Sequence, residues 1–271
     1  MAIESAAEIK TRFAQLQKNI QQNPQHISSY RELATIFMHI GNHNQALQIL
    51  SYALGISPGN AEICQHMTPL LSQIMPSAYH PELDRDIREC LLQELIDHQQ
   101  LANLIAVHLL HKYQGGLAVN AALTTDAIFL RFLSRCINIH PQMESNLIAL
   151  RTTLINQCTT KNVLPENETN LICSIALQAF ANEYIWPISS VEEAFINRDY
   201  SAGKSTTTSL LLAMYNPLHQ LIDQQEVAAL KEMQNPLIRE LIKTTVDEIV
   251  DEKQLIQAIT ALPSSNCDKI D

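Results

Sequence analysis

The sequence predicts an all-α protein, and three observations lead to this prediction. Apolar residues recur at spacings of three and four along most of the 271 residues, as on the buried face of a helix. No stretch alternates apolar and polar residues as a half-buried strand would. Most of the 11 prolines fall between the periodic segments, where they end one helix or begin the next. The expected architecture is a series of short helices joined by tight turns.

The first helices carry a repeat pattern. The stretch "SSYRELATIFMHIGNHNQALQILSYALGISPGNAE" (28–62) places large and small residues at regular positions of two helices and ends near a proline. Small alanines let two antiparallel helices approach closely, and large side chains fill the space between them. The pattern resembles the tetratricopeptide repeat, a helical hairpin of about 34 residues. The matching residues are Tyr30, Leu33, Ala34, Phe37, Gly41, Ala46, Leu50, Ala53 and Pro58.

The neighbouring repeats are less regular. Before this hairpin, Pro24 closes a helix that carries Phe13 and Leu16, and after it Pro69 interrupts the pattern. Because a repeat cannot bury its apolar face alone, we expect the hairpins to pack against a larger helical domain. The predicted regions are a repeat region (1–80), a helical recognition or regulatory domain (81–262) and a C-terminal linker or tail (263–271).

Capping signals mark where several later helices begin. Asn216 and Asn235 are each followed by a proline, as at an N-cap with proline in the first turn. Ser189 and Glu192 have the spacing of a capping box. These signals predict three further helix starts.

Composition and charge argue against several classes of function. The chain carries 28 acidic against 18 basic residues, a formal net charge of −10, and has no block rich in Lys and Arg. We therefore expect no nucleic-acid partner. The longest apolar runs, such as "LIAVHLL" (104–110), are too short to cross a bilayer. Six scattered cysteines without a C-x-x-C pair favour reduced thiols and a cytoplasmic location over disulfides or a zinc site.

Neither a dinucleotide-binding turn nor a set of metal ligands is visible. The six glycines form no G-x-G-x-x-G motif. Two histidine pairs, His39 with His43 and His108 with His111, lie one helical turn apart, but no carboxylate or cysteine completes either set. We expect no metal and no cofactor in this chain.

One stretch resembles the end of a phosphate-binding loop: "DYSAGKSTTTSLLL" (199–212). Such a loop needs its first glycine five positions before the glycine that precedes the lysine, and Arg198 occupies that position. We expect instead an exposed loop with a solvated Lys204 and a Ser/Thr cap. The alternative to this interpretation is that the chain is an enzyme with a nucleotide-dependent activity at Lys204. The buried helix after the loop is expected to begin with Leu210, Leu211, Leu212 and Met214.

The last third of the chain carries a resemblance to a known family. "LICSIALQAFANEYIW" (171–186) is followed by the acidic "VEEAF" (191–195) and then by "LLLAMYNPLHQL" (210–221). These segments resemble, in the same order, the helical region of bacterial proteins that join tetratricopeptide repeats to a class I S-adenosylmethionine-dependent methyltransferase. The likeness extends over about 85–262. Its most specific residues are Gln178, Phe180, Asn182, Glu183 and Tyr184.

In that family a catalytic domain follows the helical region. The resemblance therefore implies that the residues up to Asp271 form an accessory part, and that methyl transfer takes place elsewhere on a longer chain or on another polypeptide. We expect a non-catalytic module, without catalytic residues, that binds a substrate protein or the catalytic domain. The alternative is a free-standing tetratricopeptide adaptor unrelated to methylation.

The resemblance also suggests partner-binding residues in the second region. Asn182 and Glu183 either face a groove that holds the partner, or cap neighbouring helix ends while Phe180 and Tyr184 pack inward. His219 could titrate near neutral pH, or it simply begins a helix. The candidates in this region are Gln178, Asn182, Glu183, Tyr184 and His219.

Two further candidates lie on the first repeat helix. Arg31 and Thr35 occupy positions at which similar repeat modules use lysine and asparagine to clamp the C-terminal carboxylate of chaperones. Arg31 keeps the positive charge, but Thr35 lacks the amide, so a chaperone tail is not the partner that this pair indicates. The repeat could instead hold another peptide or pack against the second region.

Overall fold

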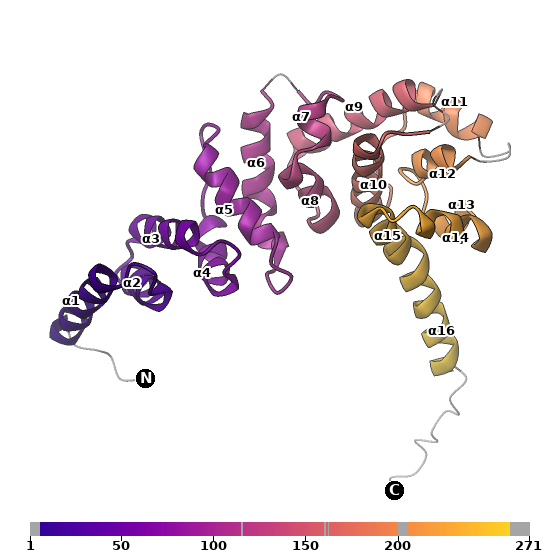
Figure 1. Ribbon diagram of the computed structural model, residues 1–271. Helices are drawn as coiled ribbons and strands as arrows, with labels where there is room; N and C mark the ends of the chain where they lie inside the picture. The colour runs from indigo at the N-terminus through magenta and orange to yellow at the C-terminus, as the bar shows by residue number, and fades with distance from the viewer. Residues whose placement is uncertain (1–5, 115, 160, 162, 200–204, 261–271) are drawn as a thin grey trace, which may run out of the picture. The chain divides into compact units, whose positions relative to one another are not determined.

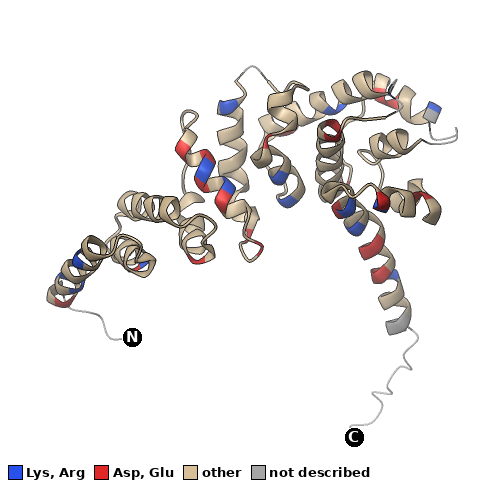
Figure 2. Cartoon of the chain, in the orientation of Figure 1, with Lys and Arg blue, Asp and Glu red and all other residues tan. Residues whose placement is uncertain are grey.

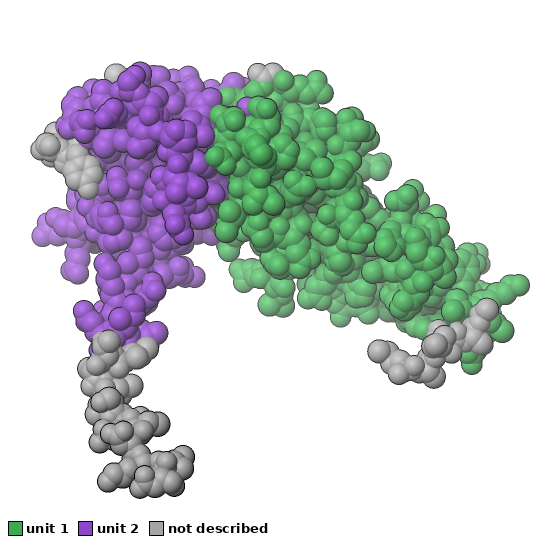
Figure 3. Space-filling model, turned by 180° about the vertical axis from the view of Figure 1, so that it is seen from behind, with its two compact units in different colours: residues 1–117, 126–145 green, residues 118–125, 146–271 purple. Residues whose placement is uncertain are grey.

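Helices make up all the regular structure of the described residues, which confirms the predicted all-α class (Figure 1). The computed structural model describes residues 6–114, 116–159, 161, 163–199 and 205–260. By its contacts the chain divides into two compact units, coloured green and purple in Figure 3. Unit 1 holds residues 1–117 and 126–145, and unit 2 holds residues 118–125 and 146–271.

Unit 1 begins with a row of helices, each packed against the next (Figure 1). Asn42 and Asn60 lie directly before the third and fourth of them, and their side chains accept hydrogen bonds from the backbone N–H groups of Gln45 and Ile63. Gly41, with φ of 77°, makes the tight turn between the second and third. The four helices are α1 (Ala6–Gln22), α2 (Ile27–His39), α3 (His43–Ile56) and α4 (Ala61–Leu71).

The residues of the predicted repeat pattern lie where α1, α2 and α3 meet. The Tyr30 hydroxyl donates to the carbonyl of Pro24 at 3.2 Å, which ties α2 to the preceding turn. The Phe37 ring packs edge-on against Phe13 of α1, with 5.8 Å between centroids. Four positions in the contact between α2 and α3 are fully buried: Ala34, Ala46, Leu50 and Ala53. The small residues therefore allow a close approach here, while membership of a repeat family stays a prediction.

Pro69, where the repeat pattern is interrupted, does not end the helix, because α4 continues through it to Leu71. Proline removes one backbone donor, and near the end of a helix this loss affects a single bond. The Thr68 hydroxyl donates to the carbonyl of Cys64 at 2.9 Å, and the Ser72 N–H donates to the carbonyl of Thr68 at 2.9 Å. These bonds complete the last turn of the helix around the proline.

The rest of unit 1 packs onto these hairpins. Arg85 donates to the carbonyl and the hydroxyl of Ser51 at 3.0 and 2.6 Å, which joins α5 to α3. Residues 81–117 therefore group with the hairpins, and the units do not divide at residue 80. The remaining elements are α5 (Pro81–Leu91), the 3₁₀-helix η1 (His98–Leu101), α6 (Ala102–Lys112), α8 (Ala127–Arg135) and the start of α9 (Pro141–Cys158).

Unit 2 is built around α10 (Glu166–Ala181), which packs against α7, α12 and α15. Every residue from Leu171 to Ala179 is buried, so this helix is enclosed on all sides. The other elements are α7 (Ala121–Thr124), the remainder of α9, α11 (Ser190–Asp199), α12 (Thr206–Leu212), α13 (Leu218–Leu221), α14 (Gln224–Glu232), α15 (Pro236–Ile242), the π-helix η2 (Lys243–Asp247) and α16 (Glu248–Thr260).

Two of the three predicted helix starts are confirmed. The Asn235 side chain accepts from two backbone N–H groups at the start of α15, and Ser189 and Glu192 exchange the hydrogen bonds of a capping box. Asn216 was predicted to cap a helix, but α13 begins after Pro217, which is itself the N-cap and has ψ of 143°. Since that extended proline is outside the helix, Asn216 lies too early to cap it.

No helix in the described ranges is long and apolar enough to cross a membrane. Basic and acidic residues alternate along α5 in unit 1 (Figure 2). Only Glu82 and Arg88 among these are exposed, and the others, such as Asp86 and Arg85, are buried or half-buried and bonded within unit 1.

Candidate functional site: a loop at the end of a buried helix

The helix that carries the candidate residues ends earlier than the sequence suggests. α10 ends at Ala181 with Asn182 as its C-cap, well before the first proline that follows, Pro187. The next two residues, Glu183 and Tyr184, have φ of 54° and 56°. Left-handed residues turn the chain back over the helix end, so the helix stops without the proline.

The turn is a Schellman motif. The Tyr184 N–H donates to the carbonyl of Ala179 at 2.8 Å, and the Glu183 N–H donates to the carbonyl of Phe180 at 2.9 Å. The first left-handed position of this motif is usually glycine, because a Cβ atom is unfavourable there. Glu183 therefore occupies a position that favours glycine, and the chain adds a second left-handed residue directly after it.

The same motif ends α2, with glycine at the corresponding position. There the Gly41 N–H donates to the carbonyl of Met38 at 3.0 Å, and the Asn42 N–H donates to the carbonyl of Phe37 at 2.8 Å. The turns after α2 and α10 are thus a relaxed and a strained example of the same motif. Two consecutive left-handed residues that are not glycine mark the second turn as unusual.

The side chains of the candidate residues point in different directions from this turn. Gln178 is fully buried, and Asn182 donates to its carbonyl at 2.9 Å. Glu183 is exposed. The Tyr184 ring packs edge-on against Phe180, and its buried hydroxyl, whose pKa is raised by burial, has no hydrogen-bond partner. The structure therefore supports a packing role for Asn182 and leaves Glu183 available for contact.

A buried polar cluster holds the chain that follows. Arg151 of α9 and Glu192 of α11 are 2 % and 0 % exposed, and the Arg151 Nε donates to the Glu192 carboxylate at 2.9 Å. The Tyr215 hydroxyl donates to the same carboxylate at 2.8 Å, and the guanidinium lies 4.5 Å from the Tyr215 ring centre. Burial opposes the ionisation of Glu192, but the bonds from Arg151 and Ser189 outweigh it and lower the pKa. The pair is charged and well hydrogen-bonded.

This cluster was missed in the sequence analysis, although a signal for it exists. Arg151 is the single charged residue in the apolar stretch "NLIALRTTLI" (146–155), and a charge on a buried helix face needs a partner. The partner could not be located by spacing, since Glu192 comes 41 residues later. The Arg151 Nη2 also donates to the carbonyl of Pro187 at 2.7 Å, so the arginine holds the loop backbone directly.

The loop between the turn and α11 presents apolar side chains to solvent. Trp186 is buried, whereas Ile185 is 76 % exposed and Ile188 is about half exposed, as is Val191 in the first turn of α11. Beside it a groove of about 490 Å³ lies between α9 and α11. Its lining combines apolar and polar residues: Ile155, Asn156, Thr159, Ser190, Val191, Ala194, Phe195 and Arg198.

Comparison of the chain with protein-family models, with curated proteins and with solved structures found no match.

His219 of the second region has a structural role at the π-helix η2. Its Nδ1 lies 3.0 Å from the carbonyl of Thr245, which can only accept, so Nδ1 carries the proton and donates. A π-helix leaves a backbone carbonyl without its usual partner within the helix. His219 therefore stabilises the junction of α15 and α16, and it is also the second residue of α13, in the first turn of a helix.

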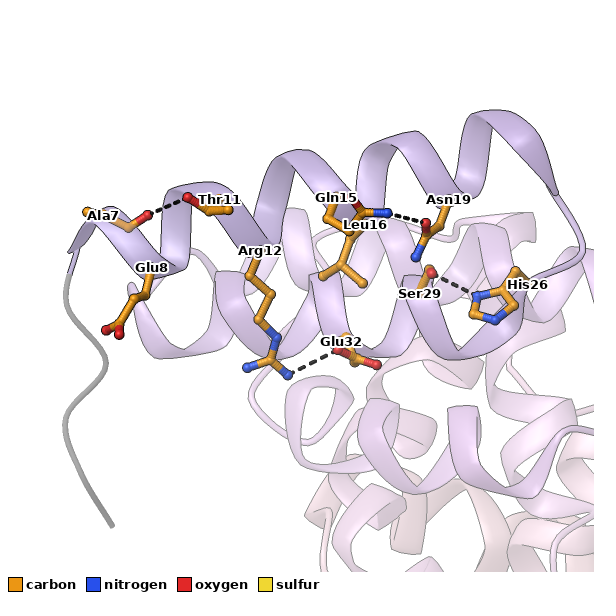
Figure 4. A pocket seen from close by; sticks show the side chains of 10 residues that line it. All are labelled: Ala7, Glu8, Thr11, Arg12, Gln15, Leu16, Asn19, His26, Ser29 and Glu32. Carbon is orange, nitrogen blue, oxygen red and sulfur yellow. Dashed lines mark hydrogen bonds and ion pairs between the residues drawn. The ribbon is translucent and has the colours of Figure 1, made fainter.

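The two repeat-helix candidates, Arg31 and Thr35, are engaged within unit 1. The Arg31 guanidinium pairs with Glu62 of α4, while its buried Nε has no hydrogen-bond partner. The Thr35 hydroxyl donates to the carbonyl of Arg31 at 2.9 Å. Neither residue lines the groove of about 650 Å³ between α1 and α2, which Arg12 and Glu32 bridge with an ion pair of 3.0 Å (Figure 4).

A second charged cluster lies in unit 1. The Asp84 carboxylate accepts from Nε2 of the fully buried His108 at 2.8 Å and from Lys112 at 2.9 Å, and Lys112 also pairs with Asp126 at 2.9 Å. Burial lowers the pKa of His108, so it is neutral at pH 7 with its proton on Nε2. The other ring nitrogen, Nδ1, is buried without a partner. The cluster links α5, α6 and the start of α8.

The described cysteines fit the expectation of reduced, buried thiols. Cys64, Cys90, Cys136, Cys158 and Cys173 are all free and buried. Burial raises the pKa of the Cys158 thiol to about 11 and those of Cys136 and Cys173 to about 12. These three thiols are protonated at neutral pH and are poor nucleophiles.

The stretch that resembles a phosphate-binding loop is described only in part. Gly203 and Lys204 lie outside the described residues, as does the predicted linker 263–271. Arg198 lies within α11, where a phosphate-binding loop would need a turn after a strand. The Ser205 side chain accepts from the backbone N–H of Thr208, which confirms the predicted cap. Leu210, Leu211, Leu212 and Met214 are buried, as expected, but α12 begins earlier, at Thr206 after the Ser205 cap, and ends at Leu212, so Met214 lies beyond it.

Proposed function

We propose that this chain is a non-catalytic protein-binding module, and that it contacts its partner through the loop 183–191 and the groove beside it in unit 2. The observation that carries the proposal is the pair of left-handed residues Glu183 and Tyr184. A left-handed residue with a Cβ atom costs roughly 1–2 kcal/mol, and strain of this kind tends to persist where it has a function. At the corresponding turn, Gly41 carries no such cost.

The surroundings support a role in binding. Arg151, which is paired with Glu192, donates to the loop carbonyl of Pro187, and Trp186 of the loop is buried. These contacts fix the loop backbone, so its exposed residues are held in one conformation. A preorganised loop loses less conformational entropy on binding than a flexible one. The arrangement combines a rigid support with exposed groups, as binding loops on a scaffold do.

The surface chemistry indicates the kind of partner. Exposed Ile185 and Ile188, together with apolar residues that line the groove, such as Phe195, suit apolar side chains of a protein segment. The Glu183 carboxylate at one end of the loop suits a basic residue or a backbone N–H group of that segment. The partner expected from the family resemblance is a methyltransferase catalytic domain or its substrate protein.

The proposal is tested by site-specific photocrosslinking in the cells that express the protein. A photoreactive amino acid at position 185 should give one predominant protein adduct, identified by mass spectrometry. The matched control is position 163, because Val163 is also apolar, is 80 % exposed and belongs to unit 2. The adduct from position 185 should weaken in the Glu183→Gly variant.

The outcomes separate the parts of the proposal. Equal adducts from positions 185 and 163, or an adduct that Glu183→Gly leaves unchanged, would show that the loop is not a specific binding surface. A methyltransferase or a methylated protein as the adduct supports the accessory role. Any other single protein supports the adaptor alternative and removes the link to methylation.

A further inference from the structure

We infer that unit 1 carries a second binding site, a groove that takes an uncharged, proline-rich peptide segment. The groove has a volume of about 400 Å³ and is lined by residues of α1, α2 and α3. Neither of the repeat-helix candidates, Arg31 and Thr35, is among its lining residues. It belongs to a different unit from the loop 183–191 and does not depend on the proposed function.

The described lining of this groove is uncharged. It consists of glutamine, tyrosine, isoleucine and leucine side chains, without Asp, Glu, Lys, Arg or His. The helix α3, which contributes to it, has no Asp, Glu, Lys or Arg along its 14 positions, although Asn44 and Gln48 are exposed to solvent. A charged ligand would give up water here without meeting an opposite charge, so charge complementarity favours an uncharged ligand.

Four glutamines give the groove free hydrogen-bond donors: Gln17, Gln21, Gln45 and Gln48. Within the described residues their side-chain amides make no hydrogen bond, and neither does the Tyr52 hydroxyl. Each amide carries two N–H groups. A proline-rich segment in the polyproline II conformation has no internal hydrogen bonds, so its backbone carbonyls are free to accept. Proline has no N–H of its own, and the donors of the groove therefore match the acceptors that such a segment offers.

Two tyrosines and two isoleucines give the groove apolar surface. Tyr30 is buried, and the hydrogen bond from its hydroxyl to the Pro24 carbonyl fixes its ring. The Tyr52 ring packs against it with 5.7 Å between centroids and is 62 % exposed. Ile20 and Ile49, both half-buried, line the same groove. Aromatic-lined grooves are the usual binding sites for proline-rich segments.

The size of the groove also favours a ligand that is ordered before it binds. A volume of about 400 Å³ holds only a short segment, so the contact area is limited. A flexible peptide would lose more conformational entropy on binding than a segment that is already in the polyproline II conformation. Among uncharged peptides, a proline-rich one therefore fits best.

The experiment is calorimetric titration of the full chain with a peptide of about ten prolines whose ends are acetylated and amidated, so that it is uncharged. Saturable binding with a dissociation constant below about 1 mM is expected. Tyr52→Ala removes the exposed ring and should weaken binding at least about tenfold. The matched control is Ile40→Ala in the same unit, since Ile40 is 61 % exposed and is not among the lining residues, and it should bind as wild type does.

A charge placed in the groove tests its neutrality. Gln48→Glu removes two N–H donors and brings a carboxylate toward the peptide carbonyls, so binding should weaken at least about tenfold. Gln65→Glu, at an exposed position of α4 that does not line the groove, should bind as wild type does. Circular dichroism melting of each variant confirms that it is folded.

Two further probes test the class of ligand. A glycine–serine peptide of the same length is uncharged but flexible, and maltotetraose is an uncharged sugar. Both should bind at least about tenfold more weakly than the proline peptide. Equal or tighter binding of either probe overturns the assignment to a proline-rich segment. The absence of saturable binding in wild type, or binding that survives Tyr52→Ala, also overturns it.

Discussion

At the scale of single residues, the most informative comparison is between Glu183 and Gly41. Both occupy the first left-handed position of a Schellman turn, and only one is glycine. The spacing of apolar residues cannot reveal a left-handed position, because such a position is defined by backbone angles. The sequence resemblance indicated the right residue, but it placed Glu183 at the end of a helix and not in a strained turn.

Glu183→Gly should stabilise the protein. It relieves about 1–2 kcal/mol of left-handed strain, and the greater freedom of glycine in the unfolded chain takes back roughly half of this. The net gain corresponds to a rise of about 2 °C in melting temperature. The control is Gly41→Ala, which should lower the melting temperature, since its Cβ meets open space and only the backbone at φ of 77° is strained. A fall for Glu183→Gly in differential scanning calorimetry would contradict this account.

His108 should make stability depend on pH. Its pKa in the folded state lies below the usual value of 6.5, so the unfolded chain binds a proton first as the pH falls. The contribution of His108 to the free energy of unfolding is therefore fully present above pH 6.5. It decreases as the pH falls from 6.5 to the lowered pKa that His108 has in the folded protein. The charged and titratable groups around it, from α5, α6, the preceding loop and the start of α8, are Asp84, Lys112, Tyr79 and Asp126.

The measurement is chemical denaturation at a series of pH values. His108→Gln should flatten the decrease in the free energy of unfolding below pH 6.5, while the exposed His39→Gln should not. Part of the slope should remain, because burial and Arg31 lower the pKa of His66 as well. An unchanged slope in His108→Gln would show that His108 is not the group responsible.

At the scale of elements, the sequence predicted that the elements are helices, but it predicted the residues at which they begin and end less accurately. The caps at Asn235 and Ser189 could be read from local chemistry, because a cap bonds N–H groups within three residues. The end of α10 and the passage of α4 through Pro69 could not, because tertiary packing decides whether such a turn or proline is tolerated. Ion pairs between residues far apart in the sequence, such as Arg151 with Glu192, likewise could not be predicted from the spacing of residues.

The π-helix η2 illustrates how a single side chain supports an element. His219→Ala removes the donor to the Thr245 carbonyl and should cost roughly 1 kcal/mol locally. Hydrogen exchange should then speed up severalfold in 243–247 and along α16, as measured by mass spectrometry. The control is His111→Ala, which removes a similar bond to the carbonyl of Pro76 in unit 1 and should leave these segments unchanged. Equal exchange in both variants would rule out this role.

At the scale of the whole molecule, the division into units differs from a simple cut of the chain. Residues 118–125 belong to unit 2 although they interrupt the sequence of unit 1, and residues 81–117 belong with the hairpins. Composition and repeat period suggested a boundary at residue 80, since the repeat pattern fades there. Contacts between α4 and α5, and between α4 and η1, cross that position and cannot be seen in the period.

A fragment that starts at residue 81 should therefore fold poorly. Without α4, the buried faces of α5 and η1, including Ile87, Cys90 and Leu101, lose their cover. We expect a lower melting temperature than that of the full chain and increased binding of a hydrophobic dye. A fragment 81–271 that melts at the temperature of the full chain would show that the hairpins form an independent domain after all.

The central claim, that the strained loop of unit 2 binds a protein, is tested most directly by measuring affinity and stability on the same variant. Calorimetric titration of the partner trapped from position 185 should show at least about tenfold weaker binding for Glu183→Gly, a loss of about 1.4 kcal/mol, while the variant melts at a higher temperature than wild type. Opposite changes in affinity and stability mean that Glu183 is kept at an unfavourable position for its contact with the partner. Unchanged affinity in the stabilised variant would contradict the claim.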